Sequence, residues 1–196
     1  LSHALELPDG TAGAFLREAA WSMERALSAG AILDLSEFTD AWSVALVLRD
    51  AELGATLGRL ERARYEHPEV QFDEILFVLA EAQAAIVQRA AAAATARLDA
   101  AARLMASGRL PGIAAREAAS LHALLDALQR SDQPAFAQAL AARLAHHLRI
   151  YRRPALASAA TGAFDLRALG IAALARARGL AVDLPSPYLP LELLAA

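Results

Sequence analysis

Apolar residues recur every three or four positions along most of the chain, and the alternation typical of a β-strand is nowhere sustained. This period is that of an α-helix with one buried face. A chain of 196 residues is long enough to enclose a continuous core. The pattern predicts an all-α protein that forms one domain over residues 1–196, a bundle of about seven to eight helices. A loose arm is expected at 1–10, and an extended tail at 180–196 is expected to pack on the domain.

Turn and capping signals divide the pattern into segments. The expected helices cover about 11–29, 113–128, 134–151 and 164–178. Another is expected to begin near Ser36 or Thr39 and to run to about Asp50, and a further one carries 53–64 and stops before His67-Pro68. Residues 72–107 carry no break, so we expect one very long helix or two helices with a kink near Gln88-Arg89. The stretch 43–48 is apolar on almost all sides, which is typical of a buried helix. Gly54 and Gly58 lie four residues apart, a spacing that favours close packing between helices.

The composition excludes several classes of site. The chain has no cysteine, so it forms no disulfide, thiolate nucleophile or thiolate metal site. No apolar run reaches the roughly 18 residues of a membrane span, because Arg89 and Arg97 interrupt the alanine-rich tract. We expect a cytoplasmic protein without a membrane segment and without a cofactor.

The spacing of the five histidines does not indicate a metal site. His146 and His147 are adjacent and would point about 100° apart on a helix. His122 and Asp126 share one helix face but supply only two ligands, whereas zinc takes three or four. No nucleophile motif or phosphate-binding loop is present. We therefore expect neither a metal nor an enzymatic activity.

Charge is divided unevenly along the chain. Residues 1–83 carry 15 acidic side chains and 6 arginines, and residues 84–196 carry 7 acidic side chains and 13 arginines. Such asymmetry steers charged partners, unless the two halves face each other in the fold. The most basic segment places four arginines around Tyr151, namely Arg143, Arg149, Arg152 and Arg153. Cations also favour a helix C-terminus without any ligand, and the net charge is −3, so we expect no nucleic-acid partner.

Two stretches resemble a known family. The first runs from Trp42 to Asp50, a helix that begins with tryptophan and ends in Arg-Asp. The second is the C-terminal third, which passes through Gly179 and ends in Tyr188-Leu189-Pro190. In this order and spacing they resemble the immunity protein 49 family of bacterial polymorphic toxin systems. The tail departs from the family pattern, because Pro185-Ser186-Pro187 stands where members tend to carry an acid before the tyrosine.

The resemblance implies an α-helical, non-enzymatic protein that neutralises a cognate toxin made by the same cell. Its motif residues are expected to be structural; they are Trp42, Arg49, Asp50, Gly179, Tyr188, Leu189 and Pro190. Trp42 is expected in the core, and Arg49 with Asp50 at a helix end, where they satisfy polar groups. Gly179 is expected to adopt the left-handed cap conformation. Burial of Tyr188 and Leu189 is expected to hold the tail on the domain.

The expected partner surface lies in the acidic N-terminal half. The candidate toxin-binding residues are Asp34, Glu37, Asp40, Glu52, Glu66 and Glu69. They would attract a basic toxin, of the kind that attacks nucleic acids or nucleotides, and block it by occlusion. The alternative is that these acids only complement the N-termini of helices.

A second interpretation is a helical ligand-binding or regulatory domain, such as the effector half of a transcription factor. An unbroken helix over 72–107 would suit the helix-paired dimers of that class. An enzyme is the third class considered, and no residue supports it. The oligomeric state and the identity of the toxin are left open by the sequence.

Overall fold

The computed structural model of the chain describes residues 11–29, 35–57, 74–108, 110, 112–152 and 164–194. Within these ranges the protein is all-α and has no strand, as the apolar period predicts. The helices are α1 (Thr11–Ser28), α2 (Leu35–Val47), α3 (Ala51–Leu57), α4 (Glu74–Val87), α5 (Ala91–Ala106), α6 (Gly112–Arg130), α7 (Gln133–Tyr151), α8 (Leu166–Ala177) and the 3₁₀ turn η4 (Leu191–Leu194). None of these helices is long and apolar enough to cross a membrane. The arm expected at 1–10 and the end of the third helix lie outside the described residues.

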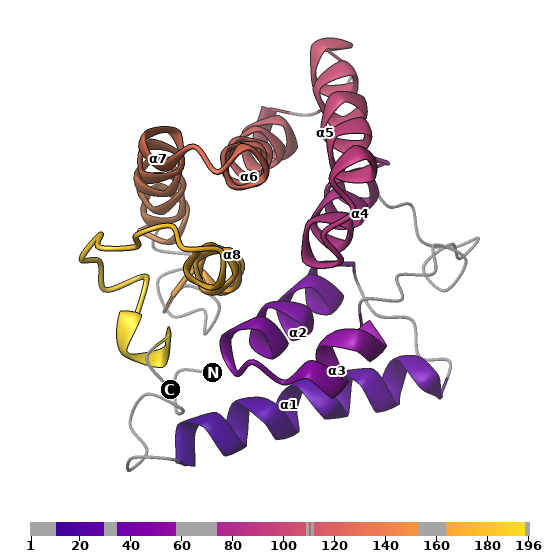
Figure 1. The fold of residues 1–196 in the computed structure, drawn as a ribbon, viewed down its shortest axis with the longest axis vertical. Helices are drawn as coiled ribbons and strands as arrows, with labels where there is room; N and C mark the ends of the chain where they lie inside the picture. The colour runs from indigo at the N-terminus through magenta and orange to yellow at the C-terminus, as the bar shows by residue number, and fades with distance from the viewer. Residues whose placement is uncertain are drawn as a thin grey trace.

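Helix α2 connects the two halves of the fold. Helices α1 and α3 pack beneath it, and α8 crosses its other side (Figure 1). Trp42 has no exposed surface, and Val44 and Ala45 are also buried. A helix this apolar forms here because neighbours cover nearly every face of it.

Helices α8 and α2 approach each other closely where they cross at Gly170. A Cβ atom built on Gly170 of α8 would lie 2.7 Å from the Cβ of Ser43 and 2.8 Å from its Cα. Ser43 is itself buried, and its hydroxyl donates to the carbonyl of Thr39 at 2.7 Å. Only glycine allows this contact. The close packing predicted at Gly54 is wrong, because a Cβ there would meet nothing within 4 Å, and Gly58 lies outside the described residues.

The described part of 72–107 is not one long helix; the alternative of two helices divided near Gln88-Arg89 is confirmed, but the division is a reversal of the chain rather than a kink. After α4 ends at Val87, the chain reverses at Arg89, which has a φ of 58°. Helix α5 then runs back along α4, as the ion pair between Arg97 and Glu81 at 3.3 Å shows. In Figure 1 the two helices overlap in the view. Helical propensity predicted both helices, but the reversal depends on the backbone of one residue.

Four helices end in the same way, with one residue in the left-handed region. These residues are Arg49 (φ 52°), Arg89 (φ 58°), Ser131 (φ 54°) and Gly179 (φ 83°). In each case the N–H of the next residue donates to the carbonyl five positions earlier, at 2.9 to 3.0 Å. This is the Schellman arrangement, which satisfies the last carbonyls of a helix. The sequence indicated it only at Gly179, because glycine is the usual residue there.

The tail folds back over α7 and α8 and ends in η4. Leu189 is 1% exposed, Leu194 is 4% exposed, and Tyr188 is partly buried. The backbone N–H of Asp165, which precedes α8, donates to the carbonyl of Tyr188 at 2.9 Å. The tail is thus extended only as far as Pro190, and the 3₁₀ turn that follows had no signal in the sequence.

Substitution of the two helical glycines by alanine should have opposite effects. Gly170→Ala inserts a methyl group against Ser43, and overpacking of this kind costs about 1–3 kcal/mol. Gly54→Ala adds the same methyl group in open space and improves helix propensity, which should stabilise the protein by up to about 1 kcal/mol. Urea denaturation of both variants measures the difference. Equal stability of the two variants would show that α2 and α8 do not touch at Gly170.

Candidate functional site

The most heavily charged part of the interior surrounds Arg143 of α7, whose side chain is only 6% exposed. Its Nε and Nη2 atoms donate to the two carboxylate oxygens of Asp165, at 2.5 and 3.2 Å. Its Nη1 atom lies 2.6 Å from Oε1 of Glu117 in α6 and donates to the hydroxyl of Ser120 at 3.0 Å. Arg143 is therefore not a surface cation that could contact nucleic acid. Its pairing with Asp165 has the two-pronged geometry of the strongest charged hydrogen bonds.

Asp165 has a second structural role as the N-cap of α8. Its Oδ1 atom accepts a hydrogen bond from the backbone N–H of Ala168 at 3.0 Å. Burial alone would raise the pKa of Asp165, but the charge of Arg143 and the bonds from Arg143 and Ala168 outweigh it and lower the pKa. Asp165 therefore stays ionised, and it raises the pKa of Arg143 against the effect of burial.

The two adjacent histidines of α7 face different carboxylates, as their angular spacing predicts. The Nε2 atom of His146 lies 3.5 Å from Oε2 of Glu117. Burial lowers the pKa of His146, and the charge of Arg143 adds to this effect, so the imidazole is neutral near pH 7. The Nδ1 atom of His147 lies 3.6 Å from Oδ2 of Asp165.

The ring of His147 also packs between two tyrosines. Its centroid is 4.5 Å from that of Tyr151 and 5.4 Å from that of Tyr188. Tyr188 belongs to the tail, so this contact joins the tail to α7. The buried polar cluster therefore connects α6, α7, α8 and the C-terminal segment, and its charges compensate one another in the interior.

No described residues form a metal centre. The Nε2 atom of His122 lies 3.1 Å from the carbonyl of Leu98, and Asp126 pairs with Arg130 at 2.6 Å, so the two candidate ligands have separate partners. In the part of the chain that the structure describes, no three His, Cys, Asp or Glu side chains are placed to hold an ion.

The candidate acidic residues lie in different environments. Asp40 is 3.3 Å from Nε of Arg167, and its side chain is 27% exposed. Burial raises the pKa of Asp40, and the charge of Asp165 adds to this effect while Arg167 opposes it. Glu52 is exposed in the first turn of α3, and Glu37 belongs to α2. Three of the candidates lie outside the described residues: Asp34, Glu66 and Glu69.

The consecutive residues Arg49 and Asp50 together form the turn between α2 and α3. Arg49 reverses the backbone, and its side chain is exposed. Asp50 begins α3, since its Oδ1 atom accepts a hydrogen bond from the N–H of Leu53 at 3.1 Å. Its Oδ2 atom lies 3.1 Å from Nε of Arg17, which ties the turn to α1.

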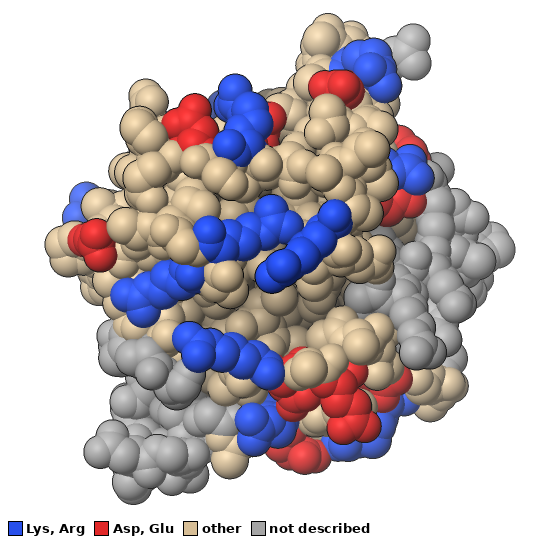
Figure 2. Space-filling view, in the orientation of Figure 1, with Lys and Arg blue, Asp and Glu red and all other residues tan. Residues whose placement is uncertain are grey.

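An apolar groove of about 610 Å³ opens where α2, α3, α8 and the end of α4 meet. Its lining residues are Trp42, Ala45, Leu46, Arg49, Asp50, Ala51, Gly54, Ala55, Ala84, Val87, Gln88, Ala173, Leu174 and Ala177. Figure 2 shows a hollowed, uncharged area on this face of the molecule. The sequence carries no signal for this groove, because small residues on separate helices form a hollow only after those helices are placed together.

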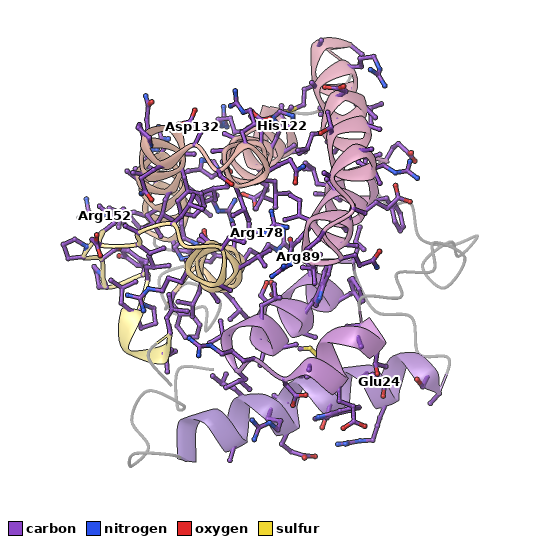
Figure 3. The ribbon with its side chains drawn as sticks, viewed as in Figure 1. Glu24, Arg89, His122, Asp132, Arg152 and Arg178 are labelled. Carbon is purple, nitrogen blue, oxygen red and sulfur yellow. The ribbon has the colours of Figure 1, made fainter. Side chains whose placement is uncertain are left out.

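Arginines border this groove. Arg49 lines it directly, whereas Arg89 and Arg178 line an adjoining cleft of about 470 Å³ that shares Ala177 with the groove. Figure 3 shows Arg89 and Arg178 close together between α4 and α8, and Figure 2 shows basic side chains gathered there. Arg178 also donates to the carbonyl of Ile86. Burial lowers the pKa of Arg178, and the nearby charge of Arg89 adds to this effect.

Comparison with known proteins places the chain in a family. The family model for Immunity protein 49 matches residues 5–193, which is nearly the whole chain. No curated protein and no solved structure matches significantly.

Replacement of Asp165 by asparagine should destabilise the fold in a pH-dependent way. Asp165→Asn removes the more deeply buried of the two carboxylates that pair with Arg143 and leaves only Glu117, and breaking a buried pair costs about 3–5 kcal/mol. Because the pKa of Asp165 is lowered in the folded state, its contribution is present above the pKa of the unfolded chain, about 3.9, and is lost as the pH falls below that value. In urea denaturation between pH 3 and pH 7, the loss of unfolding free energy of Asp165→Asn relative to the wild type should therefore become smaller as the pH falls.

The matched control is Asp40→Asn. The pKa of Asp40 is raised, so its environment disfavours the charged form, and removal of that charge at pH 7 should cost less than Asp165→Asn. A larger loss for Asp40→Asn would contradict the central position assigned to the pair between Arg143 and Asp165.

Proposed function

The chain belongs to the immunity protein 49 family, and from this premise we propose that it neutralises its cognate toxin by binding it and covering the surface on which the toxin depends. The match over residues 5–193 carries this proposal. Family membership implies an immunity role against a toxin and a generally non-enzymatic inhibitor. Occlusion is the mechanism that we add.

The arrangement of polar groups supports inhibition by binding rather than by a catalysed reaction. The ionised side chains nearest the core, Arg143 and Asp165, contact each other and are almost fully buried. Glu117, which also contacts Arg143, is largely covered as well. A substrate would need access to such groups, as catalytic acids and bases act within hydrogen-bond distance of the reacting atoms. In the part of the chain that the structure describes, the accessible features include exposed charges and an apolar groove, which are features of a binding surface.

We propose that acidic residues of the N-terminal half contribute to toxin binding. Glu52 supports this because it is exposed at the start of α3. Asp40 contributes less, since Arg167 already neutralises it. A basic toxin would be attracted by the remaining candidates, which are Asp34, Glu37, Glu66 and Glu69.

The second candidate function is a ligand-binding or regulatory domain. The groove favours it, because about 610 Å³ is within the range of small-molecule sites. The long helix that suited this interpretation is absent, since the chain reverses at Arg89. A toxin titration separates the two functions, because a regulatory domain would not inhibit.

The protein should inhibit the toxin encoded beside it in a stoichiometric manner. If inhibition is by occlusion, toxin activity should fall linearly with added protein and vanish near one equivalent, and the two should co-elute in gel filtration. Full inactivation by a small fraction of an equivalent would indicate an enzyme. The absence of both binding and inhibition would favour the regulatory function.

Reversal of acidic charge should slow the encounter with the toxin. Glu37→Arg combined with Glu52→Arg should reduce the association rate several-fold and flatten its dependence on salt, as steering charges act mainly on association. Stopped-flow or surface-based kinetics at two salt concentrations measures both effects. The control is Asp99→Arg, which reverses the charge of an exposed acid on α5 outside the candidate set and should leave the association rate near that of the wild type. An unchanged association rate with lowered stability would mean that these acids only cap helices.

A further inference from the structure

We propose that the apolar groove between α2, α3 and α8 receives a large apolar side chain of the cognate toxin, while toxin carboxylates beside that side chain pair with Arg49 and Arg89. This inference rests on the proposed function and names the site and the chemistry of the partner segment. The segment is thus apolar at its tip and acidic next to it.

The backbone at the two arginines provides the first argument. Arg49 and Arg89 both adopt left-handed φ values, of 52° and 58°, a conformation that glycine adopts without strain. A residue keeps this conformation only where the surrounding structure holds it there, and such residues cluster at functional sites. Both side chains are exposed, and both border the groove or the cleft that adjoins it.

The lack of counter-charges provides the second argument. Among the described residues no carboxylate pairs with Arg49, Arg89 or Arg178, whereas six other described arginines each have an acidic partner. Five more described arginines also lack such a partner, but none of them lines the groove or the adjoining cleft; they are Arg103, Arg116, Arg149, Arg152 and Arg176. The arginines at this border are therefore those that combine a missing described counter-charge with a place beside the apolar hollow. Arginine binds carboxylates through two parallel hydrogen bonds, so an acidic segment complements this border.

The shape of the hollow provides the third argument. Gly54 faces the groove, and a Cβ atom there would meet nothing within 4 Å. Alanines from three further helices keep the walls short, and buried Trp42 lies against the groove. Protein interfaces gain most of their affinity where an aromatic or other large side chain fills such a pocket.

The groove is also continuous with the acidic surface assigned above. Asp50 and Ala51 line one side of it, and exposed Glu52 follows them in α3. Figure 2 shows acidic side chains on one side of the hollow and basic ones on the other. One toxin surface can therefore present basic groups to α3 and its apolar, acidic segment to the groove.

Filling the groove tests the apolar contact. Gly54→Phe should leave the fold intact, because the added ring projects into open space, and should weaken binding of the adjacent toxin at least about tenfold. The matched control is Ala96→Phe, which adds the same ring at an exposed position of α5 outside the groove lining, and its affinity should stay near that of the wild type. Isothermal titration calorimetry measures affinity, and thermal denaturation checks the fold.

Replacing the arginines by glycine tests the charged contact. Arg49→Gly combined with Arg89→Gly keeps the left-handed turns and relieves their strain, so the fold should be at least as stable as the wild type. Binding should weaken about tenfold and lose much of its salt dependence. Arg103→Ala, which removes an exposed cation from α5, is the control and should bind normally.

The outcomes separate this inference from the proposed function. If the toxin binds Gly54→Phe and the double glycine variant as tightly as the wild type, the groove is not the docking site, although the immunity role stands. If the wild type dimerises and Gly54→Phe is monomeric with unchanged toxin affinity, the groove belongs to a second copy of the chain and the inference fails. If the wild-type protein does not bind the toxin, both proposals fail.

Discussion

The contact between Arg143 and Asp165 determines how the C-terminal half is assembled. Both side chains are almost completely buried, so neither charge can be left without the other. Asp165 also caps α8, and its backbone holds the tail through Tyr188. The position of α8 follows from this contact, and with it the placement of Gly170 against Ser43 of α2. This ion pair, together with the contacts of Arg143 with Glu117 and Ser120 of α6, thus links α6, α7, α8 and the tail to the central helix.

The ends of the helices explain how this helical bundle forms a groove bordered by arginines. Four of the described helices finish with a left-handed residue followed by a Schellman hydrogen bond, and arginine occupies two of these positions. The reversal at Arg89 folds α4 and α5 into a hairpin, and the reversal at Arg49 turns α2 into α3. The hollow lies where these turns meet the end of α8. The same backbone geometry that ends the helices therefore places cations at the border of the groove.

The distribution of charge agrees with a protein whose activity is binding. In the interior, acids and bases neutralise each other at short distances, as buried charges must. At the surface, exposed Glu52 follows the residues of α3 that line an apolar hollow, and exposed Arg89 lines the cleft that adjoins it. An immunity protein needs complementarity to one toxin rather than reactive groups, and specificity of that kind comes from placed charges around a well-packed anchor.

The sequence by itself determined the helices and those ends that carry a local signal. The apolar period specified the all-α class, Asp132 caps α7 as its position before proline predicts, and Gly179 ends α8 as its residue type predicts. These features depend on interactions within a few residues, which a linear pattern records.

Only the tertiary structure decided the reversal at Arg89, the close contact at Gly170 and the burial of Arg143. Arginine carries no local signal for a left-handed turn, and a glycine within an apolar helix looks tolerated until another helix crosses it. The partner of Arg143 is 22 residues away, so its charge appeared to belong to the surface. Whether a charge is buried, and whether small residues leave a hollow, depends on segments distant in sequence, and packing alone brings those together.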